Sequence, residues 1–181
     1  MRIVAGKYKA KQLFVPKGID VRPTLERTRE ALFSILYSKN LNFEELSVLD
    51  IFAGTGAFGF EALSRGAKNI TFIDKDTKPV SKNASLFASE KEKIKIIKAD
   101  VNNLPISTIK YNLIFMDAPY SKGLTDIAIE NLINKGYIAD NALILAETLK
   151  SEEIILPPCL EICDERIYGI AKIRFFIFKK S

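Results

Sequence analysis

The sequence lacks histidine and tryptophan altogether and contains only two cysteines among its 181 residues. The absence of histidine excludes every mechanism that needs an imidazole base, including a Ser-His-Asp triad. So few sulfur and imidazole ligands also argue against a metal site built from zinc and protein side chains alone. Any catalysis must therefore depend on carboxylates, hydroxyls, lysine, backbone groups or a bound cofactor.

Long apolar runs are absent as well. No stretch approaches the ~18 apolar residues that a membrane-spanning helix needs. The N-terminal residues MRIVAGKYKAKQ lack the apolar core of a secretory signal. Cys159 and Cys163 lie four positions apart, and we expect them to be free thiols in a reducing compartment. These features predict a cytoplasmic protein with no membrane segment.

Basic residues outnumber acidic ones, and the excess is confined to one segment. The chain has 27 Lys and Arg against 22 Asp and Glu, a formal net charge of +5. Residues 1–30 hold eight of the basic and three of the acidic side chains, which accounts for the whole excess. Such a segment fits a contact with nucleic-acid phosphates. The other interpretation of Lys7 to Lys11 is a solvated, lysine-rich face.

From Leu46 onward, strand-like and helix-like segments alternate. This alternation predicts an α/β fold with a mostly parallel sheet and helices on both faces. The expected strands are 47–52, 69–74, 94–99, 111–116 and 142–147, and the expected helices are 57–65, 78–90 and 124–135. Two β-rich runs in the tail, 166–171 and 172–178, predict a C-terminal antiparallel pair at a sheet edge.

The first 43 residues precede this pattern. They predict a small β-hairpin followed by a helix, with Thr24 as its N-cap and Glu26 in its first turn. We therefore divide the chain into an N-terminal extension, residues 1–43, and a main domain, residues 44–181.

A glycine-rich loop follows the first strand of the main domain. Gly54, Gly56 and Gly59 form the pattern G-x-G-x-x-G at the point where a strand passes into a helix. In that context the pattern is typical of a nucleotide-like ligand site. Asp74 follows about twenty residues later at the next strand end, where a carboxylate suits two ribose hydroxyls.

The charge near this loop favours one cofactor class. Asp50 lies four residues before Gly54, where a carboxylate would repel a pyrophosphate. S-adenosylmethionine instead carries a sulfonium and an ammonium group, so the sequence favours it over a nicotinamide or flavin dinucleotide. Asp100, after the next strand, is a candidate acceptor for the adenine amino group. A tight turn without a ligand is the remaining interpretation.

The tetrapeptide Asp117-Ala118-Pro119-Tyr120 follows an apolar strand. It fits methylation of an exocyclic amino group on a planar base. Asp117 and the Ala118 carbonyl could accept the amine hydrogens as the nitrogen becomes tetrahedral. Pro119 would fix the turn and Tyr120 would stack on the base. The alternative is an Asp that caps a turn beside a surface aromatic residue.

Several segments together resemble the RsmD family of class I, S-adenosylmethionine-dependent methyltransferases, which methylates a guanine N2 of 16S ribosomal RNA. The resemblance rests on RIVAGKYKAKQL, VRPTLERTREALFSIL, LDIFAGTGAFGFEALSRGA and ALILAE. It implies a Rossmann-like class I methyltransferase fold and an enzyme that acts on small-subunit ribosomal RNA or on the assembling 30S subunit; nothing in the sequence demands more than a monomer. The family usually has two prolines where this chain has Ala118-Pro119, so we expect a looser turn there.

The resemblance also implies a role for particular residues. The implied cofactor contacts are Asp50, Phe52, Gly54, Gly56, Asp74, Asp100 and Val101, the implied target-base contacts are Asp117, Ala118, Pro119 and Tyr120, and the implied RNA contacts are Arg2, Lys7, Lys9, Lys11, Arg22, Thr24, Arg27 and Arg29. Two other functions stay open from the residues alone. They are a DNA adenine-N6 methyltransferase and a non-catalytic RNA-binding or ribosome-assembly protein that retains the cofactor fold.

Overall fold

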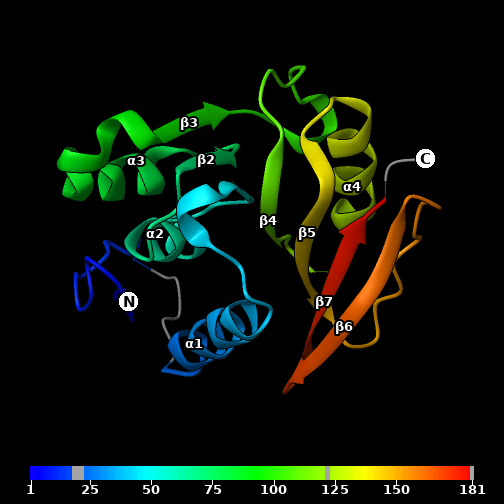
Figure 1. Ribbon diagram of the computed structural model, residues 1–181, viewed down its shortest axis with the longest axis horizontal. Helices are drawn as coiled ribbons and strands as arrows, with labels where there is room; N and C mark the ends of the chain where they lie inside the picture. Colours follow the sequence, from blue (N-terminus) through cyan, green and yellow to red (C-terminus); the bar gives the residue numbers. More distant parts are fainter. Residues whose placement is uncertain (18–22, 121–122, 180–181) are drawn as a thin grey trace.

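A seven-stranded sheet forms the centre of the protein (Figure 1). The computed structural model describes residues 1–17, 23–120 and 123–179, and for residues 23–25 the backbone alone. The strand order is β3-β2-β1-β4-β5-β7-β6. The first five strands in this order are parallel, while β7 pairs antiparallel with both β5 and β6. The predicted fold class is therefore confirmed.

The bounds of the first four strands agree closely with the predicted ones, whereas the strand predicted at 142–147 is longer at both ends and the tail differs. The strands are β1 (Ser47–Ile51), β2 (Asn69–Asp74), β3 (Ile94–Lys98), β4 (Tyr111–Asp117), β5 (Ile138–Leu149), β6 (Leu160–Tyr168) and β7 (Ala171–Phe178). The predicted first tail strand, 166–171, was wrong. It contains the turn between β6 and β7, because Gly169 has a φ of 62° that suits a tight reversal.

Among the described residues, four helices cover the sheet. They are α1 (Pro23–Ser38), α2 (Ala57–Ser64), α3 (Lys78–Ala84) and α4 (Leu124–Asn134), with 3₁₀ turns η1 (Phe43–Glu45), η2 (Ser85–Lys93) and η3 (Val101–Asn103). Two predictions need correction. The first helix begins at Pro23, so Thr24 lies inside it; proline's fixed φ suits the first helical position. The predicted helix 78–90 ends at Ala84, because Phe87 has non-helical angles.

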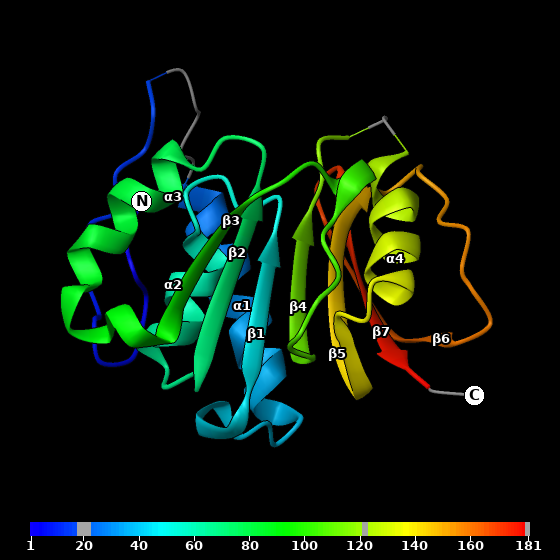
Figure 2. The same cartoon turned by 90° about the horizontal axis from the view of Figure 1, so that it is seen from above.

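The two faces of the sheet pack against different helices (Figure 2). Leu113 and Phe115 of β4 belong to the core beneath α1, α2 and α3, whereas Ile114 and Met116 belong to the core beneath α4. Alternation with a period of two explains this division, and burial on both faces explains the continuous apolar sequence. None of the helices in the described part of the chain is long and apolar enough to cross a membrane.

The N-terminal residues 1–17 lie against α2 and α3. One antiparallel bridge joins Arg2 to Gln12, which gives the predicted hairpin its reversal but no regular ladder. Ile3 and Leu13 are buried in the same core as α1, α2 and α3. The predicted N-terminal extension and main domain therefore share one core. Their division at residue 43 stays a prediction that the extension binds RNA and the main domain binds the cofactor.

Candidate active site

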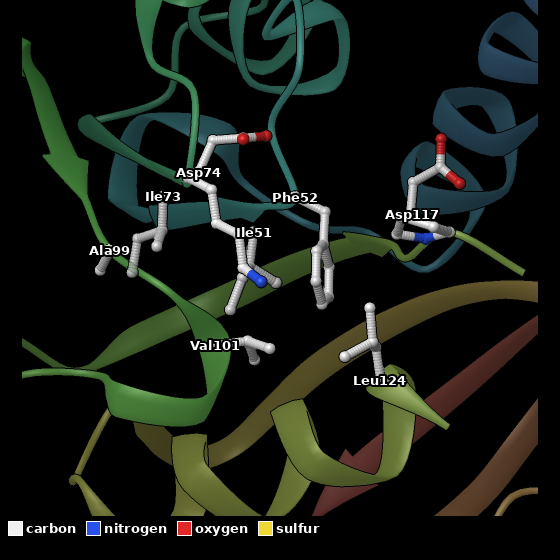
Figure 3. Close-up of a pocket in the computed structure, with 10 residues that line it drawn as sticks. Ile51, Phe52, Ile73, Asp74, Ala99, Val101, Asp117 and Leu124 are labelled. Atoms are coloured by element: carbon white, nitrogen blue, oxygen red, sulfur yellow. The ribbon is translucent and has the colours of Figure 1, made fainter. Parts of the chain in front are cut away.

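A pocket of about 280 Å³, which we call the main pocket, opens at the carboxyl ends of β1, β2 and β4 (Figure 3). Ligands of open α/β sheets bind at this edge. Its lining residues come from successive strand ends and from the start of α4: Ile51, Phe52, Ile73, Asp74, Lys75, Ala99, Val101, Asp117, Pro119 and Leu124. In the view of Figure 3, Ala99 and Asp117 lie at opposite ends of the pocket, with Phe52 between them. Phe52, Asp74, Val101, Asp117 and Pro119 were predicted site residues, and the fold brings them together.

The three glycines of the loop have different structural roles. A Cβ added to Gly54 would meet nothing closer than the Phe52 carbonyl oxygen at 3.9 Å, so a ligand can approach the backbone there. A Cβ on Gly56 would lie within 3.0 Å of Phe60, Phe72 and Val80 side-chain atoms, and one on Gly59 would lie 2.3 Å from Phe72. Gly54 thus leaves the ligand side open, while the other two allow α2 to pack on the sheet.

Phe52 has a φ of 62°, an unusual value for a residue with a side chain. Its half-buried ring forms part of the pocket wall. Such conformations cluster at ligand sites, where surrounding structure offsets a cost of about 1–3 kcal/mol. The unusual backbone conformation and the sequence resemblance therefore point to the same residue, Phe52, as a ligand contact.

Asp74 is held by the backbone on both carboxylate oxygens. Its Oδ2 accepts from the Gly54 amide at 2.8 Å, and its Oδ1 accepts from the Asp76 amide at 2.9 Å. A carboxylate has about four acceptor positions, so two remain for a ligand diol. The side chain lines the pocket in a fixed orientation, as the predicted ribose contact requires.

Asp50 lies beneath the loop rather than on the pocket wall. Its side chain is buried, and its Oδ2 accepts from the Gly59 amide at 2.9 Å, which links β1 to α2. Burial raises the pKa of Asp50 to about 8; the Gly59 bond opposes this rise, and the charges of Asp117 and Asp74 add to it. A direct cofactor contact by Asp50 stays a prediction that the pocket lining does not support.

The contact of Asp100 with the adenine stays a prediction that the lining of this pocket does not support. Its Oδ1 accepts from the Asn102 amide as the cap of η3, and its Oδ2 pairs with Lys75 at 2.8 Å. The Lys75 ammonium, followed by the Asn102 bonds, lowers the pKa of Asp100 to about 2. The carboxylate lines a neighbouring hollow instead, because capping fixes its direction. Ala99 and Val101, on either side of it, do line the pocket.

Asp117 lies at the end of β4 and borders two cavities. It lines the main pocket and also a hollow of about 10 Å³ beside it, which Glu147 lines too. Desolvation by the surrounding protein, followed by the charge of Glu147, raises the pKa of Asp117. The residue nevertheless keeps an exposed surface toward the open pocket, so solvent moderates this rise.

Tyr120 is tied to a residue that the sequence motif does not contain. Its hydroxyl donates to Glu147 Oε1 at 2.6 Å, and desolvation together with this bond raises the pKa of Tyr120. Between Asp117 and Tyr120 in the sequence, Ala118 is buried and Pro119 lines the main pocket. Glu147 and Lys75 were missed from sequence, although Glu147 is the last residue of β5 that pairs with β4 and Lys75 directly follows β2. Ile51, Ile73, Ala99 and Leu124 were also missed, since apolar residues at strand and helix ends have no distinctive pattern.

Most of the predicted RNA contacts lie at the surface of the N-terminal segment. Arg2 pairs with Glu26 at 3.3 Å and Lys7 with Glu90 at 2.5 Å, while Lys11 donates to the Leu86 carbonyl at 2.7 Å. Arg2, Lys9 and Arg27 line a cleft of about 470 Å³ together with two glutamates. Arg22 and the side chain of Thr24 lie outside the described residues.

Arg29 does not face the solvent, so its predicted RNA contact was wrong. The side chain is only 2% exposed, and its Nε lies 3.6 Å from Glu61 Oε2. Burial lowers the pKa of Arg29, and the nearby Glu61 charge opposes this change. Glu61 also accepts from the Val4 amide at 2.7 Å and from Arg65 Nε at 2.8 Å. Arg29 thus joins α1 to α2 and the N-terminal segment through one buried carboxylate.

The sheet order, the glycine loop and the pocket beyond the strand ends define a class I methyltransferase, the class that takes its methyl group from S-adenosylmethionine. The family described as Conserved hypothetical protein 95 matches residues 1–177, and this chain belongs to that family, the RsmD family.

Individual relatives agree with this assignment. The chain is 32% identical to Ribosomal RNA small subunit methyltransferase D of Haemophilus influenzae over 182 residues, which cover 97% of this chain and 93% of the relative. It is 34% identical to the Escherichia coli K12 protein of the same name, over 82% of this chain and 74% of the relative. The solved structure of Escherichia coli yhhF superposes with a TM-score of 0.84 at 29% identity, covering 100% of this chain and 99% of that one.

Proposed function

We propose that the protein transfers a methyl group from S-adenosylmethionine to the exocyclic N2 of a guanine in small-subunit (16S) ribosomal RNA. The observation that carries the proposal is the position of Asp117, which borders both the main pocket and the adjacent hollow. A group at this boundary can contact a bound methyl donor on one side and an acceptor amine on the other. The names of the curated relatives support the choice of RNA.

The residues of the main pocket fit the proposed donor. Ile73, Ala99 and Val101 offer apolar surface for a purine, and Asp74 holds a carboxylate at the position expected for a ribose. The space above Gly54 is open, as a ligand close to the backbone requires. Asp74 and Asp117 make the pocket suitable for a cation. When bound, S-adenosylmethionine supplies an electrophilic methyl group, and the cofactor's sulfur keeps the electrons of the broken C–S bond.

Asp117 orients and activates the acceptor in this proposal. An exocyclic amine is a poor nucleophile because its lone pair is delocalised into the ring. A carboxylate that accepts one of its hydrogens favours the tetrahedral nitrogen of the transition state. The nitrogen must also lose a proton, and Asp117, with its raised pKa, can receive it. No imidazole is required, in agreement with the composition.

The basic residues of the N-terminal segment hold the RNA in the same proposal. Arg2, Lys7, Lys9, Lys11 and Arg27 supply positive charge outside the main pocket. Phosphate contacts of this kind position a nucleic acid without reading its sequence. The proposal places the protein in the cytoplasm with its RNA, as a monomer.

The proposal is tested by methyl transfer from isotope-labelled S-adenosylmethionine. Three substrates are compared: naked small-subunit RNA, partly assembled 30S subunits and unmethylated plasmid DNA. The RNA is then digested to nucleosides for mass spectrometry. We expect label in N2-methylguanosine from RNA or subunits and none in DNA. Labelled N6-methyladenine in the plasmid would favour the DNA methyltransferase instead, and donor binding without transfer to any substrate would favour a non-catalytic RNA-binding protein.

A further inference from the structure

Glu147 is a second carboxylate beside the proposed acceptor site. It lies on β5 as the direct register partner of Asp117 on β4, and this pair is the last one between the two parallel strands. Glu147 does not line the main pocket, whereas Asp117 does. The two carboxylates are therefore neighbours, with Asp117 nearer the methyl donor and Glu147 farther from it.

Both carboxylates line the small hollow, and its other lining residues are apolar. These are Leu32, Phe58, Phe115, Met116, Leu145 and Ile173. The volume of about 10 Å³ is smaller than a purine, so the hollow is not a preformed base cavity and only the edge of a base could reach it. The polar atoms that meet that edge come from Asp117 and Glu147.

The orientation of Glu147 is fixed by Tyr120. The hydroxyl of Tyr120 donates to Glu147 Oε1 at 2.6 Å. A carboxylate offers about four acceptor positions, so this single bond leaves room for a donor from a substrate. A half-buried acceptor that is already oriented recognises such a donor more strongly than one free in water.

Guanine, adenine and cytosine each carry an exocyclic amine, but they differ in the ring nitrogen beside it. A pair of neighbouring carboxylates can distinguish them by this difference. Guanine presents two donors side by side, the N2 amine and the N1–H. Adenine and cytosine present an amine beside a ring nitrogen with a lone pair, which a second carboxylate would repel. Two neighbouring acceptors thus match guanine and oppose the other two bases.

We infer that Glu147 is a specificity-determining residue that accepts the N1–H of the target guanine while Asp117 accepts from its N2 amine. This inference rests on the proposed function and extends it, because it assigns the choice of base to a residue outside the Asp117-to-Tyr120 motif. A structural role alone would explain the bond to Tyr120 but would not predict any change in base preference.

The test uses 2-aminopurine, which keeps the 2-amino group of guanine but has a lone pair at N1. The methylated guanine is first mapped with the wild-type protein and is then replaced by 2-aminopurine in RNA ligated from two fragments. We expect the wild type to favour guanine by about 10- to 100-fold in kcat/KM, as loss of a bond to a charged group would give. Equal rates on the two RNAs would overturn the inference without any variant.

Glu147→Gln then assigns the preference to this residue. Its amide can donate to a lone pair, so we expect the guanine-to-2-aminopurine ratio to fall about tenfold or more, while binding of S-adenosylmethionine measured by calorimetry is unchanged. Tyr120→Phe is the matched comparison, since it removes the hydrogen bond that orients Glu147 but leaves the carboxylate; its turnover can fall, and we expect its guanine-to-2-aminopurine ratio to fall less than that of Glu147→Gln. An unchanged ratio in Glu147→Gln would overturn the inference, whereas a wild type that forms no N2-methylguanosine would overturn the proposed function.

Discussion

Three aspartates near the strand ends occupy different electrostatic environments. Burial raises the pKa of Asp50 to about 8, the Lys75 ammonium lowers that of Asp100 to about 2, and desolvation with the Glu147 charge raises that of Asp117. The residue type alone therefore does not determine the charge of the site. Its partners do, and each partner comes from a different strand or loop.

Replacement of Asp50 by asparagine is expected to change the pH dependence of stability. A buried carboxyl whose pKa is raised from about 4 to about 8 contributes fully below pH 4, and its contribution is lost as the pH rises through 8. Asparagine can still accept from the Gly59 amide and stays neutral. The free energy of unfolding of Asp50→Asn minus that of the wild type should therefore rise by a few kcal/mol, in order of magnitude, between pH 4.5 and 8. Urea unfolding measures it, and a constant difference would contradict this explanation.

Replacement of Asp117 by asparagine is expected to lower turnover without loss of the donor. Removal of a charged acceptor from the transition state should reduce kcat by about 10²- to 10³-fold. Because the pKa of Asp117 is raised, wild-type activity should increase with pH as the carboxylate ionises, and the variant should lack this increase. Methyl transfer across a pH series measures both effects. Asp140→Asn, on an exposed part of β5, is the control, and a pH profile shared by both variants and the wild type would assign the titration elsewhere.

At the scale of helices and strands, the predicted bounds are most accurate where a single local pattern determines the element. β2 matches to the residue because its run is apolar and is bounded by polar positions. The segment after Ala84 was misjudged for a long-range reason. The Phe87 ring stacks on Phe60 with a centroid separation of 4.6 Å, and this packing stabilises a kink that helical spacing cannot show. The start of α1 at Pro23, by contrast, follows a local signal, because proline is common at the first helical position.

The glycine loop gives a prediction at this scale, with Gly56 and Gly136 as a matched pair. Their φ values are 78° and 76°, so alanine pays a similar backbone penalty of about 1–2 kcal/mol at either position. A Cβ at Gly136 meets nothing within 4 Å, but one at Gly56 meets three side chains under 3.0 Å. We expect Gly56→Ala to lower the free energy of unfolding by about 1–3 kcal/mol more than Gly136→Ala. Equal losses in urea unfolding would mean that backbone strain alone requires the glycine.

At the scale of the whole molecule, the site residues that were misplaced share one cause. Arg29 looked like a surface cation because its neighbours in sequence are polar, yet Glu61, 32 positions away, holds it in the core. Asp100 was predicted as a ligand contact, yet it pairs with Lys75 and does not line the pocket. Strand-end positions such as Asp74 and Asp117 were predictable, since parallel strands bring their carboxyl ends to one edge. The pairing of charges across the fold was not.

The basic N-terminal segment gives the prediction for the whole molecule. Neutralising Lys7, Lys9 and Lys11 together should weaken binding to small-subunit RNA and make the slope of log affinity against log salt shallower by about two, since Lys7 is already partly paired. Fluorescence anisotropy at several salt concentrations measures the slope, and affinity for S-adenosylmethionine should not change. The control changes the same net charge at the exposed Lys95, Lys110 and Lys150. If the control weakens RNA binding as much, the positive surface is diffuse rather than N-terminal.

The contacts of residues 1–17 also determine when this surface can form during synthesis. Val4 bonds to Glu61, Phe14 to Asn83 and Lys7 to Glu90, at separations of 57, 69 and 83 residues. Translation at ~5–20 residues per second makes the segment wait about several seconds for these partners. Until η2 has emerged from the ribosome, the lysines have no surface to lie on and no fixed direction. A nascent chain thus carries the charges of residues 1–17 well before it carries the partners that fix their arrangement.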